Sequence, residues 1–281
     1  MVGPPVAIAG DMTNPTLSVL GSLRGAFRAL AAGALSLSVV ACGQAVPAAR
    51  VAAPPTARVS VPCAGGQVRS DQALASLAGC TVVTGDLRIR SASSLRALSS
   101  LRVVRGKLDI SQNPKLRSLA GLEALTQVGR LSLRDNPSLV SLQALSGLRS
   151  ADALVIEGAP LLTSVSGLGG LTSLETLAIE DTGVTRLDGL RNLARVEQLI
   201  LLDNPVLVSA AGLGRIENAE LIDIRGNTLL YGGQDEFLPR LTWATEAVLS
   251  DNASMTRGDV DGFRRRVAIA PGAAAGEHAS R

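Results

Sequence analysis

The sequence predicts a mostly-β solenoid, an α/β coil of about seven rungs with one parallel sheet and short helical caps at both ends. Residues 106–252 repeat with a period of 23 residues, apart from one deletion in the fourth copy. Each copy opens with two apolar residues in alternation, such as Leu108 and Ile110, which is the period of a strand. An asparagine follows in most copies. A period of about 20–29 residues with these features is typical of leucine-rich solenoids.

Residues 1–42 are predicted to be an export signal. Arg24 and Arg28 precede an apolar run, residues 29–40, that is too short for a bilayer span of about 20 residues but suits a signal peptide. The run leads into VVAC at residues 39–42, which resembles a bacterial lipobox and makes Cys42 the expected site of lipidation. An ordinary secretory signal with an incidental cysteine is the alternative. Met1 and Met12 are alternative starts.

The residues after Cys42 bear on the location of the protein. Gly43 stands where an Asp would retain an enterobacterial lipoprotein, so the resemblance implies an anchor in the outer membrane of a Gram-negative bacterium. Residues 43–62 are rich in Ala and Pro and show no amphipathic period. We therefore expect an extended tether between the lipid and the domain.

Residues 63–84 are predicted to cap the N-terminal end of the coil. Ser70 suits the N-cap of a short helix, and Gly79 suits its end. Cys63 and Cys80 flank this helix. With Cys42 lipidated, these two cysteines are left to pair, which favours a disulfide formed in an oxidising compartment. Two buried free thiols are the alternative, whereas a zinc site would need about four ligands and no histidine is near.

The same segment resembles a known family. Cys63, Leu74, Leu77 and Cys80, followed by the pattern TVVxGxLxI over residues 81–89, are similar to the start of the receptor L domain. That family is a leucine-rich, right-handed β-solenoid found in insulin- and epidermal-growth-factor-type receptors and in bacterial surface proteins. The resemblance implies a right-handed coil over roughly residues 63–252 and a ligand-binding role. We expect no growth-factor signalling, because the chain shows no second cysteine cluster and no transmembrane or kinase segment.

Two further repeat positions have a structural role. Leucines recur at every third residue after the strand, as at Leu116, Leu119 and Leu122, which favours a 3₁₀ or extended return path over an α-helix. The recurrent asparagine is expected to turn inward and bond backbone groups of the neighbouring rung. This structural ladder is broken at Ala159 and Thr182. Its members are Asn113, Asn136, Asn204, Asn227 and Asn252.

Residues 254–267 are predicted to cap the other end with a helix. Val260, Phe263 and Val267 would share one face and cover the last rung. Acidic residues come early and arginines late in this segment, which suits the helix dipole. The capped solenoid would thus span residues 63–267. The Ala- and Gly-rich residues 268–281 are expected to be a disordered tail.

Composition argues against nucleic-acid binding and catalysis. The 27 basic and 24 acidic residues give a formal charge of only +3, and aromatic residues make up 2%. A basic track beside stacking aromatics is therefore missing, and we expect no nucleic-acid partner. The only histidine, His278, lies in the tail, so a Ser or Cys nucleophile would lack its base. We expect no enzyme and no cofactor.

A recurrent aspartate is the one pattern that could suggest a metal. It directly precedes the ladder position and supplies oxygens of the kind calcium takes. The column is interrupted by Gly158 and Gly226, and Asp before a turn is ordinary turn chemistry. We therefore expect no metal site at Asp135, Asp181, Asp203 and Asp251.

The outward side of the sheet is the expected functional surface. Outward positions of a water-exposed sheet should be polar, yet the third to fifth rungs carry apolar residues at their centres. A contiguous apolar patch with charged edges favours an exported, lipid-anchored module that binds a protein or glycan partner without catalysis. Alternatives are a spacer lipoprotein without a specific ligand, a patch that reflects only β-propensity, and a patch covered by a loop. The candidate binding face comprises Val155, Glu157, Ala178, Glu180, Ile200, Leu202, Asp223 and Arg225.

Overall fold

The computed structural model describes residues 61–232 and 237–269 of the 281-residue chain. The described residues belong to one compact unit, residues 57–281. The expected lipidation site Cys42, the rest of the signal peptide, tether residues 43–60 and tail residues 270–281 with His278 lie outside the described residues. Within the described ranges, no helix is long and apolar enough to cross a membrane.

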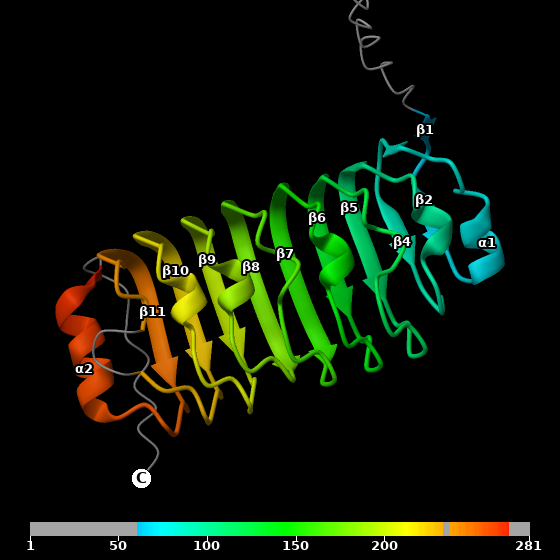
Figure 1. Cartoon of the computed structure of the whole chain (residues 1–281). Helices are drawn as coiled ribbons and strands as arrows, with labels where there is room; N and C mark the ends of the chain where they lie inside the picture. Colours follow the sequence, from blue (N-terminus) through cyan, green and yellow to red (C-terminus); the bar gives the residue numbers. More distant parts are fainter. Residues whose placement is uncertain (1–60, 233–236, 270–281) are drawn as a thin grey trace, which may run out of the picture. The chain divides into compact units, whose positions relative to one another are not determined.

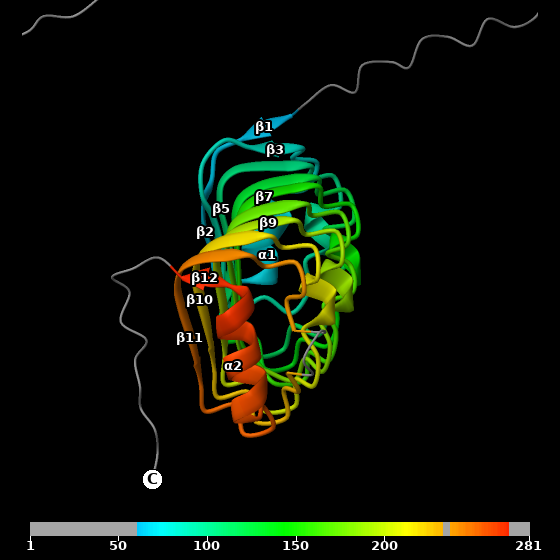
Figure 2. The ribbon, with the colours of Figure 1, turned by 90° about the vertical axis from the view of Figure 1, so that its left-hand side faces the viewer.

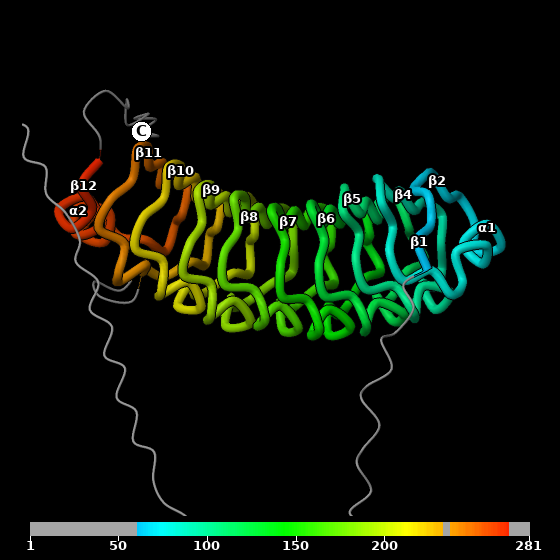
Figure 3. The backbone as a smooth tube through the Cα atoms, turned by 90° about the horizontal axis from the view of Figure 1, so that it is seen from above, coloured from blue at the N-terminus to red at the C-terminus, as the bar shows by residue number. Residues whose placement is uncertain are grey.

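A parallel sheet organises this unit, and it is solenoid-like because its strands follow one another in sequence order (Figure 1). Seen from above, the strands lie side by side in chain order, with α1 at one end and α2 at the other (Figure 3). Seven strands of the described residues, β5 to β11, are eight to ten residues long. The strands are β1 (Pro62–Cys63), β2 (Gly66–Val68), β3 (Val82–Val83), β4 (Leu87–Ile89), β5 (Val103–Ser111), β6 (Gln127–Arg134), β7 (Ser150–Ala159), β8 (Ser173–Thr182), β9 (Arg195–Leu202), β10 (Asn218–Arg225), β11 (Trp243–Ser250) and β12 (Ala268–Ile269).

The sequence repeat sets the register of the sheet. Leu108 pairs with Leu131, and Leu131 with Leu154, so the period of the sequence is also the period of the coil. The deletion lies in the turn after β8. Ala159 still pairs with Thr182 at the end of that strand, whereas beyond the turn the bridges are one residue closer in sequence. The turns therefore absorb length changes while the strands stay aligned.

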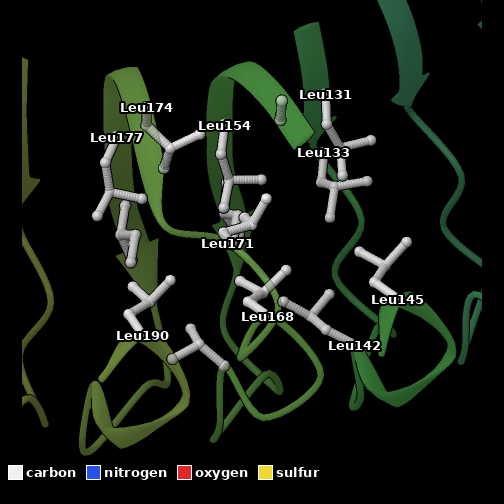
Figure 4. Close-up of a cluster of buried hydrophobic side chains, with 14 of the residues drawn as sticks. Leu131, Leu133, Leu142, Leu145, Leu154, Leu168, Leu171, Leu174, Leu177 and Leu190 are labelled. Carbon is white, nitrogen blue, oxygen red and sulfur yellow. The ribbon is translucent and has the colours of Figure 1, made fainter. Parts of the chain in front are cut away.

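Leucines from both sides of each rung fill the interior. Figure 4 shows leucines of β6, β7 and β8 pointing toward leucines of the return paths, and all those labelled are at most 3% exposed. Among the described residues, the prediction of 3₁₀ structure is confirmed in four rungs, whose short helices lie on the side of the coil opposite the long strands (Figure 2). These helices are η1 (Arg96–Leu98), η2 (Gln143–Leu145), η3 (Asp188–Leu190) and η4 (Ala211–Leu213).

The predicted asparagine ladder is confirmed, with one correction. All five asparagines are buried, and their amides bond backbone groups of the preceding rung. Thr182 does not interrupt the column, because its hydroxyl donates to Asn204 Oδ1 at 2.6 Å. The column is interrupted at Ala159, because its methyl group can neither donate nor accept a hydrogen bond. The ladder therefore has two hydrogen-bonded segments.

The residue before each ladder position has left-handed backbone geometry. Six non-glycine residues there have φ between 49° and 58°, and Gly158 and Gly226 have φ of 64° and 69°. Gly and Asp tolerate this conformation better than most residues. Aspartate and glycine thus recur in this column because both tolerate its left-handed backbone conformation. The six are Ser91, Gln112, Asp135, Asp181, Asp203 and Asp251.

The N-terminal cap holds a helix and a disulfide. Ser70 is the N-cap of α1 (Asp71–Ala75), and its Oγ accepts from the Ala73 N–H at 3.1 Å. The helix ends four residues before Gly79, so the expected end is wrong; Gly79, with φ of 84°, serves the later turn into Cys80. Cys63 and Cys80 form a disulfide with their Cα atoms 5.9 Å apart, which removes the alternative of free thiols.

The C-terminal cap is the helix α2 (Arg257–Arg266), which lies across the end of the coil (Figure 2). Thr256 and Asp259 form a capping box at its start, and three arginines occupy its last turn. Phe263 is 2% exposed, and its ring centroid lies 5.7 Å from that of Phe237. Beyond the helix, β12 pairs with β11, so its two residues belong to the sheet and not to the expected tail.

Candidate binding face

The sheet brings the eight residues of the candidate binding face together. Val155 pairs with Ala178, Ala178 with Ile200, and Ile200 with Asp223, so these four form one outward column. The residues two positions later form the adjoining column in the same way: Glu157, Glu180, Leu202 and Arg225. Because neighbouring strands lie about 4.8 Å apart, the four strands β7 to β10 place the set within about 14 Å along the sheet.

The apolar part of this face is a narrow row with little relief. Val155, Ile200 and Leu202 are half-buried, whereas Ala178 is only 4% exposed between its larger neighbours. Ala153, in the column on the other side, is 1% exposed. The most exposed large apolar side chains of the described residues lie elsewhere. The apolar part of the face is therefore a narrow row of largely buried side chains and not a broad protruding patch.

Charged pairs bracket the row at both ends. On the N-terminal side, Arg134 Nε lies 3.1 Å from Glu157 Oε2. On the C-terminal side, Arg225 donates to both carboxylate oxygens of Asp223, with Nη2 2.6 Å from Oδ2. Such a charged rim around an apolar centre is common in protein interfaces.

Glu180 differs from these paired residues. Burial raises its pKa above the usual range, and the negative charge of Glu157 beside it adds to this effect. Its carboxylate forms no ion pair within the described part of the chain. A half-buried carboxylate of raised pKa, next to the apolar row, is a group that a cation or hydrogen-bond donor from a partner would stabilise.

A second apolar strip was not anticipated from the sequence. Val206 and Leu229 lie two positions after their ladder asparagines, and Val208 and Tyr231 lie four positions after them. Their exposed fractions range from 37% to 61%, and the Tyr231 N–H donates to the Val208 carbonyl at 3.2 Å. The available signal was the recurrence of apolar residues at positions that flank an inward leucine.

The aspartates before the ladder occupy the left-handed positions of the coil. Their recurrence reflects the left-handed backbone of that column. The described residues contain no group of three or more His, Cys, Asp or Glu side chains that could hold a metal ion.

Comparison of the chain with protein-family models, curated proteins and solved structures found no match.

Proposed function

We propose that this chain is an exported, lipid-anchored protein of the cell envelope that binds a protein or glycan partner through the outer face of its sheet, without catalysis. One observation carries the proposal: the contiguous row formed by Val155, Ala178, Ile200 and Leu202, with ion pairs at both ends and the unpaired Glu180 beside it. Desolvating the row would stabilise a complex, and the charges would orient the partner.

We also propose that the coil is a right-handed, receptor L-like solenoid of leucine-rich rungs. The organisation of its N-terminal cap supports this. The disulfide between Cys63 and Cys80 encloses α1, and β3 follows directly. Leu87 and Ile89 of β4 then enter the core as the family pattern requires. A handedness assigned from an experimental structure would test the proposal, and a left-handed coil would refute it.

The disulfide also supports an oxidising compartment, the VVAC sequence supports a lipid anchor on Cys42, and Gly43 after it supports the outer membrane. Cys42→Ser should leave the protein unprocessed or soluble in cell fractionation. Incorporation of labelled palmitate into this variant at the level of the unchanged protein would contradict the anchor.

The binding proposal is tested with the full chain carrying Val155→Asp and Ile200→Asp. Both side chains are half-buried on the outer face, so the circular dichroism spectrum should be retained while capture of envelope partners is lost. The matched control is Val140→Asp with Leu161→Asp, two exposed apolar residues that lie away from this face and outside the second apolar strip. Loss of the fold would mean that the face is covered. Retained capture with a retained fold would place the ligand elsewhere.

A spacer role is the second candidate, because the row is narrow and no side chain on it is strongly exposed. A spacer should capture no partner in either form, whereas a binding module should lose capture only in the sheet-face variant.

A further inference from the structure

The side of the coil that carries the η helices has three adjoining hollows, which we together call the groove. Three hollows share lining residues in sequence. The first, of about 370 Å³, shares Ser118 and Ala120 with the second, of about 350 Å³. The second shares Gln143 and Ser146 with the third, of about 530 Å³. The groove therefore crosses the coil obliquely from the rung of Ser93 to that of Arg215, about 24 Å for five steps between rungs.

The groove is strongly cationic although the chain as a whole is nearly neutral. Its lining includes one carboxylate, Glu123, which already accepts from the Gly121 N–H at 2.9 Å. None of the lining cations forms an ion pair within residues 61–232 and 237–269. Asp71 lies beside one end, but its carboxylate accepts from the Ser93 and Ser94 backbone. The lining cations are Arg96, Lys115, Arg117, Arg149, Arg191 and Arg215.

Two adjacent glycines shape the widest hollow. A side chain at Gly170 would collide with the Leu148 carbonyl, so this position must stay small. At Gly169 the nearest atom to an added Cβ would be the Gly189 carbonyl oxygen at 3.7 Å, an ordinary van der Waals contact, so a side chain fits there. Beside the hollow, Arg149 is held by the Ser146 carbonyl at 2.7 Å and the Leu148 carbonyl at 3.2 Å. A fixed guanidinium thus lies next to an empty space large enough for a sugar residue.

We propose that this groove binds a linear anionic glycan, with the arginines and Lys115 contacting its oxyanion groups. Neutral polar side chains also line the groove along its length and suit a chain of hydroxyl groups: Ser118, Ser141, Gln143, Thr172 and Asn192. A single-stranded nucleic acid fits less well, because no aromatic side chain lines the groove for base stacking. The proposal does not depend on the sheet face, which lies on the other side of the coil.

The test measures binding of the purified full chain to polygalacturonate, to dextran sulfate and to uncharged dextran at low and physiological salt. The carboxylated or the sulfated polymer should bind and the uncharged one should not, and the stronger of the two identifies the preferred oxyanion. Affinity should fall with salt, because binding releases counterions. Arg191→Gln with Arg215→Gln should weaken binding about tenfold, at about threefold for each exposed charge contact.

Matched variants separate the groove from net charge. Arg105→Gln with Arg130→Gln removes the same charge at two exposed positions of the strands, and binding should persist. Gly169→Glu should abolish binding, while Gly169→Gln, of nearly the same size, should weaken it less. The sheet-face variant of Val155 and Ile200 should bind the polymer normally, so this result is separable from the proposed function. Equal losses in the groove and strand variants, absence of binding at low salt, or tighter binding of a thymidine oligonucleotide of equal charge would each overturn the proposal.

Discussion

Replacing Asn204 with alanine should destabilise the coil by about 3 kcal/mol. The side chain is fully buried and connects three rungs. Its Oδ1 accepts from the Thr182 backbone N–H at 3.2 Å and from the Thr182 hydroxyl at 2.6 Å. Its Nδ2 lies 2.9 Å from the Ile179 carbonyl oxygen and 3.1 Å from Asn227 Oδ1.

The magnitude follows from the groups left behind. In Asn204→Ala, the Thr182 N–H and the Ile179 carbonyl lose this partner in a dry interior, and each unsatisfied buried group costs about 1–3 kcal/mol. For a domain of this size, a loss of about 3 kcal/mol lowers the Tm by roughly 6–12 °C. At the neighbouring Asp203, φ is 52°, so Asp203→Ala should cost up to about 1 kcal/mol in backbone strain. Asp203→Gly should cost almost nothing.

Thermal unfolding followed by circular dichroism measures all three variants. Asn218→Ala, at an exposed asparagine outside the ladder, is the matched control and should stay within about 0.5 kcal/mol of the unchanged protein. A larger loss for Asp203→Ala than for Asn204→Ala would mean that the assigned ladder position is wrong. Equal losses for Asn218→Ala and Asn204→Ala would refute the role of the buried amide.

Two further predictions concern the sheet and the left-handed column. Because the folded state raises the Glu180 pKa, the folded chain holds this proton more tightly than the unfolded chain, and stability falls as pH rises through that range. Glu180→Gln should therefore raise the Tm at pH 7, with a gain that shrinks in acid. Glu157→Gln should change the Tm little, because it removes an exposed ion pair and also the repulsion of Glu180. Gly226→Ala should destabilise more than Gly158→Ala in chemical denaturation. Both positions have positive φ, but only at Gly226 would the new methyl group collide with the Asp203 carboxylate, so Asp203→Gly should restore part of the loss.

The repeating part of the fold could be predicted from the sequence because each rung buries apolar side chains at the same repeat positions. Alternating pairs such as Leu108 and Ile110 determine the strand, and the constant period determines the register between strands. The sequence did not reveal the role of Thr182. Its hydroxyl replaces the N–H donor of an asparagine amide, and this is visible only once the structure places it beside Asn204. The end of α1 was placed too late because Gly79 marks a turn in a loop and not the end of the helix.

The candidate surfaces were less accessible to prediction. Alternation places Ala178 and Ile200 on the outer side of the sheet, but their exposure depends on the size of side chains from neighbouring rungs. The cationic groove was beyond sequence reasoning for a related reason. Arg149, Arg191 and Arg215 occupy different repeat positions in their rungs, and they line one hollow together with Gly169 and Gly170.

The gap at Ala159 divides the side-chain ladder into two hydrogen-bonded segments and should weaken the coupling between the two halves of the coil. On one side Asn113 and Asn136 are linked, and on the other Thr182 is linked through Asn204 to the C-terminal rungs. Backbone pairing crosses β7, but no side-chain amide bridges it. In a stacked protein each rung is stabilised only by its neighbours. Unfolding should therefore start most easily at the rung of Ala159, which lacks the side-chain hydrogen bonds of the ladder. Amide hydrogens near β7 should then exchange before those on either side, which makes this rung the boundary at which one half of the protein can open while the other remains folded.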